Sequence, residues 1–406
     1  KPLVINPMLL KIFDEAIVNA ADNFTRKSGT TEIRVEVDQA KGVFSIYNNG
    51  ATVPVVKHDK KDALTGKKIY TPEMVFFRLR AGQNFDDDTK RYEGGRNGIG
   101  IKLASIFSVQ SKVEIVDKRG RHYVQEYRDN MNTAQKPEIG TSDQSPFTRV
   151  TFQIDLSRFM SSDVALTSIP DDVFSLMRRR SIDIAACCEG VKVFFNGQRI
   201  QTTFEEYANR QLCDMPLLVS SKKHWSVAVG LTPEDADSKN VSFVNNVWTR
   251  DDGHHIDHVR DQVCKVLLDS SAVKKLGLKK SDIQKQLRFV VKSYLVNPTF
   301  NSQMKERMTL PIKSFDTQFV VTGPMRKQLL SGPLLERLQD VRDAKDGRKL
   351  TKNDGKKVRT MNILKLTDAK KAGTAESSKC TIIFTEGDSA LALALAGLSV
   401  VDKKYY

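Results

Sequence analysis

Residues 9–23 read LLKIFDEAIVNAADN, and a period of 3.6 residues sorts this stretch into two faces of a helix. The apolar face holds Leu10, Phe13, Ile17 and Ala20. The nearly opposite face carries Glu15, Asn19 and Asn23, with Asp22 beside them. Asn is a mediocre helix former, whereas a carboxylate can accept a proton and an amide oxygen can bind a divalent cation. This face therefore favours chemistry, although an ordinary amphipathic surface helix is the commoner explanation of such a pattern taken alone.

Composition limits the kind of protein. The chain has 406 residues, which favours two or three domains, and its 40% hydrophobic and 28% charged residues are typical of a soluble globular protein. The net charge of +15 favours a polyanionic partner such as nucleic acid. Five scattered cysteines without metal-ligand spacing indicate a reducing compartment and no structural zinc. The longest apolar run, Ala390 to Val401, is too short for a membrane span, and the missing initial Met suggests a fragment.

A second informative stretch, residues 94–102, reads GGRNGIGIK. Its glycines allow a close backbone approach to a ligand, and the helix expected from Ile101 to Phe107 would start there, which creates an anion site. A Walker A loop is excluded because Ile101 follows Gly100, and a dinucleotide-binding fold is excluded because no strand directly precedes the glycines. A phosphate-holding lid that includes Lys102 and a flexible surface loop both remain compatible with this stretch alone.

Hydrophobic periodicity predicts an α+β chain. The expected strands are 32–37, 43–47, 112–117, 122–127, 149–154, 191–195, 224–229, 241–245 and 287–296. Besides the two helices above, helices are expected at 72–79, 175–188, 256–268 and 326–344. Residues 380–384 have the character of a buried strand, and an apolar helix should follow them. The expected domains are 1–200, 201–372 and 373–406.

Motifs in this order resemble the GHKL family of ATPases: Glu15 to Asn19 on a helix, Asn48-Asn49-Gly50 at a strand end, and the lid Gly95 to Gly100. Within that family, IFDEAIVNAADN, YNNG and GGRNGIGIKLASIFS resemble eukaryotic type II DNA topoisomerases. The resemblance continues through NPTFNSQMKERMTLP into TEGDSA and covers essentially the whole chain. It implies a GHKL (Bergerat) ATPase sandwich, then a ribosomal-S5-like transducer domain, then a linker and the start of a TOPRIM domain.

The resemblance also implies roles for single residues. Glu15 would be the general base that activates water, Asn19 would coordinate Mg²⁺, and Lys305 would reach the γ-phosphate of ATP from the second domain. The expected nucleotide contacts are Asn19, Asn23, Asn48, Asn84, Gly95, Arg96, Asn97, Gly98, Ile99, Gly100, Lys102, Gln303 and Lys305. Glu386 would take part in a second metal site. Gly82 and Gln83 replace two serines of relatives, so the hydroxyl contacts of those serines are lost.

The implied activity is that of the ATPase and clamp region of a type II topoisomerase. ATP would close a homodimer through the ATPase domain around double-stranded DNA, and this region would hydrolyse ATP without cutting DNA. A nuclear location follows from the resemblance, and a mitochondrial one stays open. Two alternatives remain: a MutL-like or chaperone-like GHKL ATPase, which the EGDSA segment disfavours, and a nucleotide-regulated DNA clamp that barely hydrolyses ATP.

Overall fold

The computed structural model describes residues 6–59, 61–62, 65–78, 90–95, 98–161, 164–213, 216–233, 239–330, 332–353, 369–372, 374–398 and 404–406. The chain forms two compact units. One unit comprises Lys1–Gln262 and Arg288–Val320, and the other comprises Val263–Leu287 and Val321–Tyr406. The first unit contains both large sheets, so the boundary between the two compact units does not lie near residue 200. The expected domain boundaries stay a prediction.

Helix α1 (Pro7–Thr25) confirms the helix predicted at the start of the chain. Asn6 caps it by accepting a backbone N–H of the first turn. The apolar face is buried, and the ring of Phe13 packs edge-on against Phe44, with centroids 5.5 Å apart. The polar face is largely shielded as well, because Glu15 is only 5% exposed and Asn19 and Asn23 are half-buried. Helix α1 is therefore an interior helix whose polar face has partners inside the protein.

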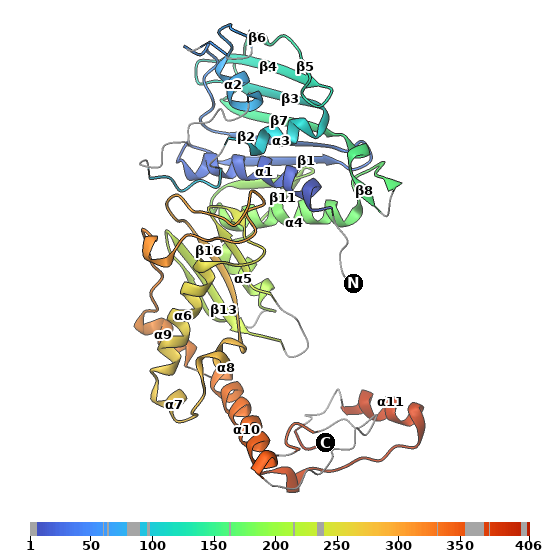
Figure 1. Ribbon diagram of the computed structural model, residues 1–406, viewed down its shortest axis with the longest axis vertical. Coiled ribbons are helices and arrows are strands. Elements are labelled where there is room, and N and C mark those ends of the chain that lie inside the picture. The colour runs from blue at the N-terminus through green and yellow to red at the C-terminus, as the bar shows by residue number, and fades with distance from the viewer. Residues whose placement is uncertain are drawn as a thin grey trace. The chain divides into compact units, whose positions relative to one another are not determined.

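Nine strands of the described residues form the first sheet (Figure 1). From edge to edge they are β11 (Gln198–Ile200), β10 (Lys192–Phe195), β1 (Glu32–Asp38), β2 (Val43–Asn49), β7 (Phe147–Ile154), β3 (Ser108–Val116), β4 (Arg121–Arg128) and β5 (Thr133–Ala134), with β6 (Glu138–Thr141) also paired to β4. Strand β1 is antiparallel to β2 and parallel to β10. The inward residues Ile33, Val35 and Ile46 are buried, as their alternation predicts.

Four helices accompany α1 and this sheet in the first part of the chain. They are α2 (Thr71–Phe77), α3 (Gly100–Ile106), the 3₁₀ helix η1 (Leu156–Arg158) and α4 (Asp171–Cys187). Helix α1 contacts both α3 and α4, and α3 contacts β3 (Figure 1). A separate hairpin joins β8 (Met160–Ser161) and β9 (Val164–Ala165). The glycine stretch leads directly into α3, as predicted.

The second sheet has the order β12 (Pro216–Ser221), β13 (Trp225–Leu231), β16 (Leu287–Ser293), β14 (Val241–Val244) and β15 (Val247–Trp248). Helix α5 (Phe204–Gln211) packs on β12 and β13 and begins with a capping box between Thr203 and Glu206. Helix α6 (His254–Leu268) follows β15 in the chain, and η2 (Ile312–Ser314) lies beyond β16.

Arg180 of α4 connects the layers of the first unit. Its Nε donates to Asp14 Oδ1 at 2.7 Å, and its Nη1 donates to Asp183 Oδ2 at 2.9 Å. Its Nη2 donates to the carbonyl oxygen of Asn246, between β14 and β15, at 3.2 Å. The side chain is 1% exposed, and a charge so buried depends on these partners. Arg180 therefore joins α1, α4 and the second sheet.

The second unit is mainly helical. Its complete helices in the described residues are α7 (Ser271–Lys274), α8 (Lys280–Gln284), α9 (Gly323–Leu329), α10 (Pro333–Asn353), η3 (Ser377–Lys379) and α11 (Gly387–Leu398). Arg337 of α10 donates to Gln286 Oε1 at 3.1 Å. Of the helices that the structure describes, none combines the length and apolar character required to cross a bilayer.

Three local predictions were wrong. Residues Cys380 to Phe384 form no strand, and Phe384 is 86% exposed, because no described strand pairs with this segment. The helix predicted at 326–344 is two helices, interrupted near Gly332, whose φ of 65° suits glycine. Asn48 and Asn49 complete β2, and the turn begins at Gly50 instead.

Candidate functional site

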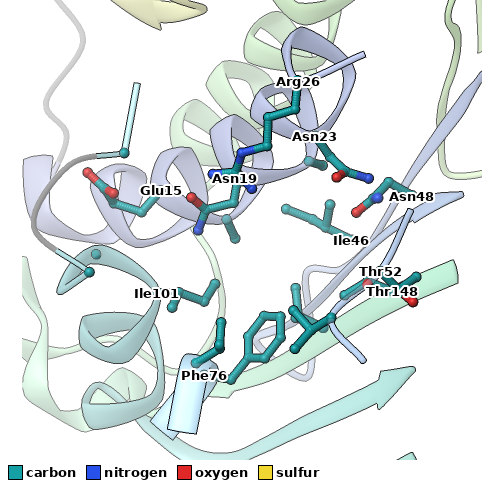
Figure 2. A pocket seen from close by; sticks show the side chains of 18 of the residues that line it. Glu15, Asn19, Asn23, Arg26, Ile46, Asn48, Thr52, Phe76, Ile101 and Thr148 are labelled. Carbon is teal, nitrogen blue, oxygen red and sulfur yellow. The ribbon is translucent and has the colours of Figure 1, made fainter. Parts of the chain in front are cut away.

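A cavity of about 510 Å³ lies in the first unit, lined by α1, α3, the adjoining strands β2 and β7, and the loop that carries Gln303. This volume is typical of a site for a small molecule or cofactor. Figure 2 shows Glu15, Asn19 and Asn23 in a row along α1 on one side of the cavity, with Phe76 and Ile101 opposite. The cavity therefore has a wall of polar groups and a wall of apolar groups.

Glu15 and Lys305 line the charged end of the cavity, and two lysines pair with Glu15. Lys305 Nζ lies 3.0 Å from Glu15 Oε1 and 3.3 Å from Oε2, although 290 residues separate the two. Lys11, one turn before Glu15, lies 2.8 Å from Glu15 Oε1. Lys305 is only 6% exposed. The carboxylate predicted as a base and the ammonium group predicted to reach it thus share one site.

The charges around Glu15 set its protonation. Burial by itself raises the pKa of Glu15, but the ammonium groups of Lys305 and Lys11 outweigh burial and lower this pKa to about 2. Burial lowers the pKa of Lys305, but Glu15 outweighs it and holds that pKa above its ordinary value. Both groups are therefore charged across the whole neutral range.

The loop around Lys305 explains how this residue reaches Glu15. Two backbone hydrogen bonds close the loop, from Thr309 N to Thr299 O at 2.8 Å and from Asn301 N to Arg307 O at 3.1 Å. Lys305 has a φ of 59°, an uncommon conformation for a residue with a side chain. These hydrogen bonds hold the two sides of the loop together, and the loop presents Gln303 and Lys305 to the cavity.

The glycine stretch lies against α1, as the lid prediction requires. A side chain at Gly100 would place its Cβ 1.9 Å from Glu15 Oε2, so any residue other than glycine would displace the Glu15 carboxylate. The Lys102 side chain is buried and donates to the carbonyl oxygen of Gly98. Burial lowers the pKa of Lys102 to about 8. Gly98, Gly100 and Lys102 all line the cavity.

Asp22 is the anchor of this stretch, a role that the sequence did not reveal. Its two carboxylate oxygens accept the N–H groups of Gly94 and Gly95, each at 2.9 Å. Burial raises the pKa of Asp22 to about 6, although the Gly94 N–H and the Arg26 charge oppose the rise. Arg26 in turn pairs with Glu93 at 2.7 Å. The Gly95 N–H, expected to bind nucleotide, thus donates to Asp22.

The asparagines take different positions around the cavity, and Asn19, Asn23 and Asn48 all line it. Asn23 Nδ2 donates to Thr30 Oγ1 and to the carbonyl oxygen of Ala51, both at 3.0 Å. Its amino group therefore ties α1 to the turn after β2. Asn48 is 7% exposed and stands at the far end of the cavity, as Figure 2 shows.

The far end of the cavity is mostly apolar, with Asn48, Thr52 and Thr148 as its polar residues. Its apolar residues are Ile46, Val53, Val75, Phe76, Ile101 and Val150. Asn48 and Thr148 face each other as partners in the pairing of β2 with β7. Thr148 was missed because only the register of two strands distant in sequence brings it to Asn48.

Some predicted residues lie elsewhere. Asn84, Arg96 and Asn97 fall outside the described residues. Ile99 does not line the cavity, and its carbonyl oxygen accepts the first amides of α3. Glu386 is exposed in the second unit, and the described His, Cys, Asp and Glu residues form no group of three that could hold a metal. Its role in a metal site stays a prediction.

Comparison with protein families identifies the class. Residues 6–158 match the family model described as histidine kinase-, DNA gyrase B- and HSP90-like ATPase. Residues 192–342 match the model described as DNA gyrase B. The first match covers α1, the glycine stretch and the far end of the cavity. The chain is therefore a GHKL ATPase of α+β fold.

Curated relatives and solved structures narrow the class. The chain is 35% identical to DNA topoisomerase 2 of Candida glabrata and 38% identical to that of Bombyx mori, over 100% and 98% of its length. The ATPase region of Saccharomyces cerevisiae topoisomerase II matches with a TM-score of 0.76 and 32% identity, over 84% of this chain and 88% of that one. The ATPase and transducer domains of Balamuthia mandrillaris DNA topoisomerase II match with a TM-score of 0.75 and 31% identity, over 83% and 86%.

The chain belongs to the DNA topoisomerase II family and corresponds to its ATPase and transducer region. It spans 30% of the length of the Candida glabrata relative and 26% of that from Bombyx mori.

Proposed function

We propose that this chain hydrolyses ATP in the cavity beneath the glycine stretch and that it couples hydrolysis to the passage of one DNA duplex through another. The observation that carries the proposal is the meeting of Glu15 and Lys305 across 290 residues in a cavity that Asn19 and Gly100 also line. A base, an amide, a glycine-rich loop and a cation in one place suit phosphoryl transfer, which depends on positioning and charge compensation.

The two ends of the cavity fit the two ends of ATP. The apolar walls near Ile46, Phe76 and Ile101 suit the faces of a purine. The Asn48 side-chain oxygen can accept a hydrogen bond from the exocyclic amino group of adenine, which guanine does not offer at that position. Lys102 and Lys305 at the opposite end suit the phosphates.

The residues at the charged end also fit Mg²⁺ in its usual form on a nucleotide. Mg²⁺ keeps several waters and binds proteins through few oxygen ligands when phosphates supply the others. Asn19 offers such an oxygen on the α1 wall, one helical turn after Glu15. When bound, Mg²⁺ would neutralise charge on the phosphate oxygens.

Glu15 would take the proton from the attacking water. Its pKa of about 2 makes it a weak base while Lys305 pairs with it. A terminal phosphate competes for the Lys305 ammonium, and as Lys305 shifts towards the phosphate, burial raises the pKa of Glu15. Binding of the correct nucleotide thus activates the base, and loss of the terminal phosphate restores the pairing of Glu15 with Lys305.

We further propose that ATP closes two copies of this region into a homodimeric clamp on double-stranded DNA in the nucleus. Two observations support this proposal, one for DNA binding and one for the link between the ATP site and the second sheet. The net charge of +15 suits a polyanionic partner such as DNA. Arg180 supports coupling between ATP and the second sheet, because it links α1 to that sheet through Asp14 and Asn246. Movement at the charged end therefore has a direct physical connection to the transducer sheet.

Steady-state ATP turnover with and without a supercoiled DNA duplex tests the proposal. We expect magnesium-dependent hydrolysis that DNA stimulates. ATP binding without turnover in either condition would instead support a nucleotide-regulated clamp. Sedimentation with a non-hydrolysable ATP analogue tests the dimer, and a monomer at saturating analogue would contradict nucleotide-driven closure.

A further inference from the structure

A second cavity, of about 400 Å³, adjoins the first. Gly95, Gln303 and Lys305 line both cavities and so form the wall between them. On the nucleotide side of this wall, Lys305 Nζ meets Glu15 at 3.0 Å. The second cavity therefore begins at the end of the site where the terminal phosphate is cleaved.

The second cavity has a cation of its own, the half-buried Arg91. Arg91 lines it, and the Nη1 atom of this residue is buried without a hydrogen-bond partner in the part of the chain that the structure describes. Its backbone is fixed, because Asn297 N donates to Arg91 O at 3.0 Å. A buried guanidinium nitrogen without a partner is costly and normally has an acceptor. An oxyanion in the cavity would supply that acceptor.

The rest of the lining agrees with an anion. Thr299 and Ser302 bring hydroxyl groups to the wall, and Lys305 adds a second cation. Among the described residues that line the cavity, Glu93 is the one carboxylate, and Arg26 holds it with two hydrogen bonds, at 2.7 and 3.1 Å. The Glu93 charge is thus compensated from outside the cavity.

We propose that this cavity binds inorganic phosphate released from the γ-position and is its exit route while ADP remains in the first cavity. The inference rests on the proposed function. In hydrolysis, the water oxygen bonds to the γ-phosphorus, and the bond from that phosphorus to the bridging oxygen breaks, which leaves the oxygen on ADP. Glu15 takes the water proton. The free phosphate then exchanges the Lys305 contact for Arg91 on the other side of the wall.

Titration of inorganic phosphate into the ADP-saturated protein, followed by phosphorus NMR, tests the site. We expect Arg91→Gln to weaken phosphate binding about tenfold, the loss of one charge-assisted hydrogen bond. Arg199→Gln, which changes an exposed arginine on β11, is the matched control and should bind phosphate as the unmutated protein does. Equal phosphate binding by both variants would overturn the proposal.

Two further measurements keep the outcome decisive. If Arg91→Gln does not fold, the unmutated protein can be modified with phenylglyoxal, which reacts with arginine, in the presence and absence of phosphate. Phosphate should slow the modification of Arg91, and an unchanged rate of modification would overturn the site. Rapid-mixing kinetics with a phosphate sensor should show slower phosphate release in Arg91→Gln at an unchanged rate of ATP cleavage. A protein that binds phosphate at Arg91 without hydrolysing ATP would refute the proposed function alone, whereas hydrolysis without this site would refute only the exit route.

Discussion

Glu15 and Asp22 are two buried carboxylates on the same face of α1, about two turns apart, and their surroundings give them opposite properties. Two ammonium groups flank Glu15 and lower its pKa to about 2. Asp22 accepts two backbone N–H groups, and burial nevertheless raises its pKa to about 6. Full charges compensate for desolvation, whereas backbone dipoles and a partly engaged arginine do not.

The difference separates a chemical role from a structural one. Glu15 stays ionised and changes its basicity only if its lysine partners move. Asp22 holds the glycine stretch through Gly94 and Gly95, and no lysine of the described residues donates a hydrogen bond to it. Two neighbouring acids whose pKa values differ strongly often have different roles in a site. Substituting one acid at a time tests whether Glu15 and Asp22 have these different roles.

Glu15→Gln has the largest expected effect. The amide keeps the size of the side chain but cannot take a proton, so ATP turnover should fall about a thousandfold while nucleotide binding persists. Asp22→Asn is the matched change and keeps an acceptor for one glycine amide, so its turnover should fall less than about tenfold. Steady-state turnover and ATP titrations measure both. Equal losses of turnover in the two variants would contradict the assignment of a chemical role to Glu15 and a structural role to Asp22.

The glycines that face the two acids provide the next test. A Cβ at Gly100 would lie 1.9 Å from Glu15 Oε2, whereas a Cβ at Gly95 would lie 3.5 Å from Asp22 Oδ2, an ordinary contact. Gly100→Ala should therefore displace Glu15 and lower the free energy of unfolding by about 1–3 kcal/mol. Gly95→Ala should change it by less than about 1 kcal/mol. Urea unfolding of both variants measures the effect, and a larger loss in Gly95→Ala would contradict this geometry.

The pH dependence of stability sharpens the comparison further. The folded pKa of Asp22 lies above the ordinary value of 3.8, so its contribution to stability is present below pH 3.8 and is lost as pH rises through about 6. Relative to Asp22→Asn, the unmutated protein should lose about 2 kcal/mol between pH 4 and pH 6.5. Glu15 behaves in the opposite way, because its contribution is present above pH 4.5 and is lost as pH falls towards 2. Urea unfolding at several pH values checks both signs.

The sequence predicted the parts of this site that depend on local pattern. The spacing of residues in α1 identified the face with Glu15, Asn19 and Asn23, and the glycine stretch was placed correctly at the start of α3. The resemblance to a family was required for Lys305, because a lone lysine in a loop carries no signal of its own. The capping box of Thr203 and Glu206 is a sequence signal that would have revealed α5.

Other features arise only from tertiary structure. Thr148 reaches the cavity through the register of β2 with β7, and Asp22 acquires its role from the path of the glycine stretch. Arg180 is the last of three adjacent arginines in the sequence, and nothing in that run distinguishes it; only packing makes it 1% exposed and pairs it with Asp14. The apolar pattern of Cys380 to Phe384 predicted a strand, but a strand requires a neighbour to form a ladder.

The meeting of Glu15 and Lys305 is the central claim, and the affinity of Lys305→Met for two nucleotides tests it most directly. Methionine keeps the apolar stem without the charge, so the contact with the terminal phosphate is removed together with the ion pair to Glu15, and of these two only the phosphate contact distinguishes ATP from ADP. Calorimetry should show affinity for a non-hydrolysable ATP analogue reduced about tenfold, with affinity for ADP nearly unchanged. An equal reduction for both nucleotides, or none for either, would contradict the placement of Lys305 at the terminal phosphate.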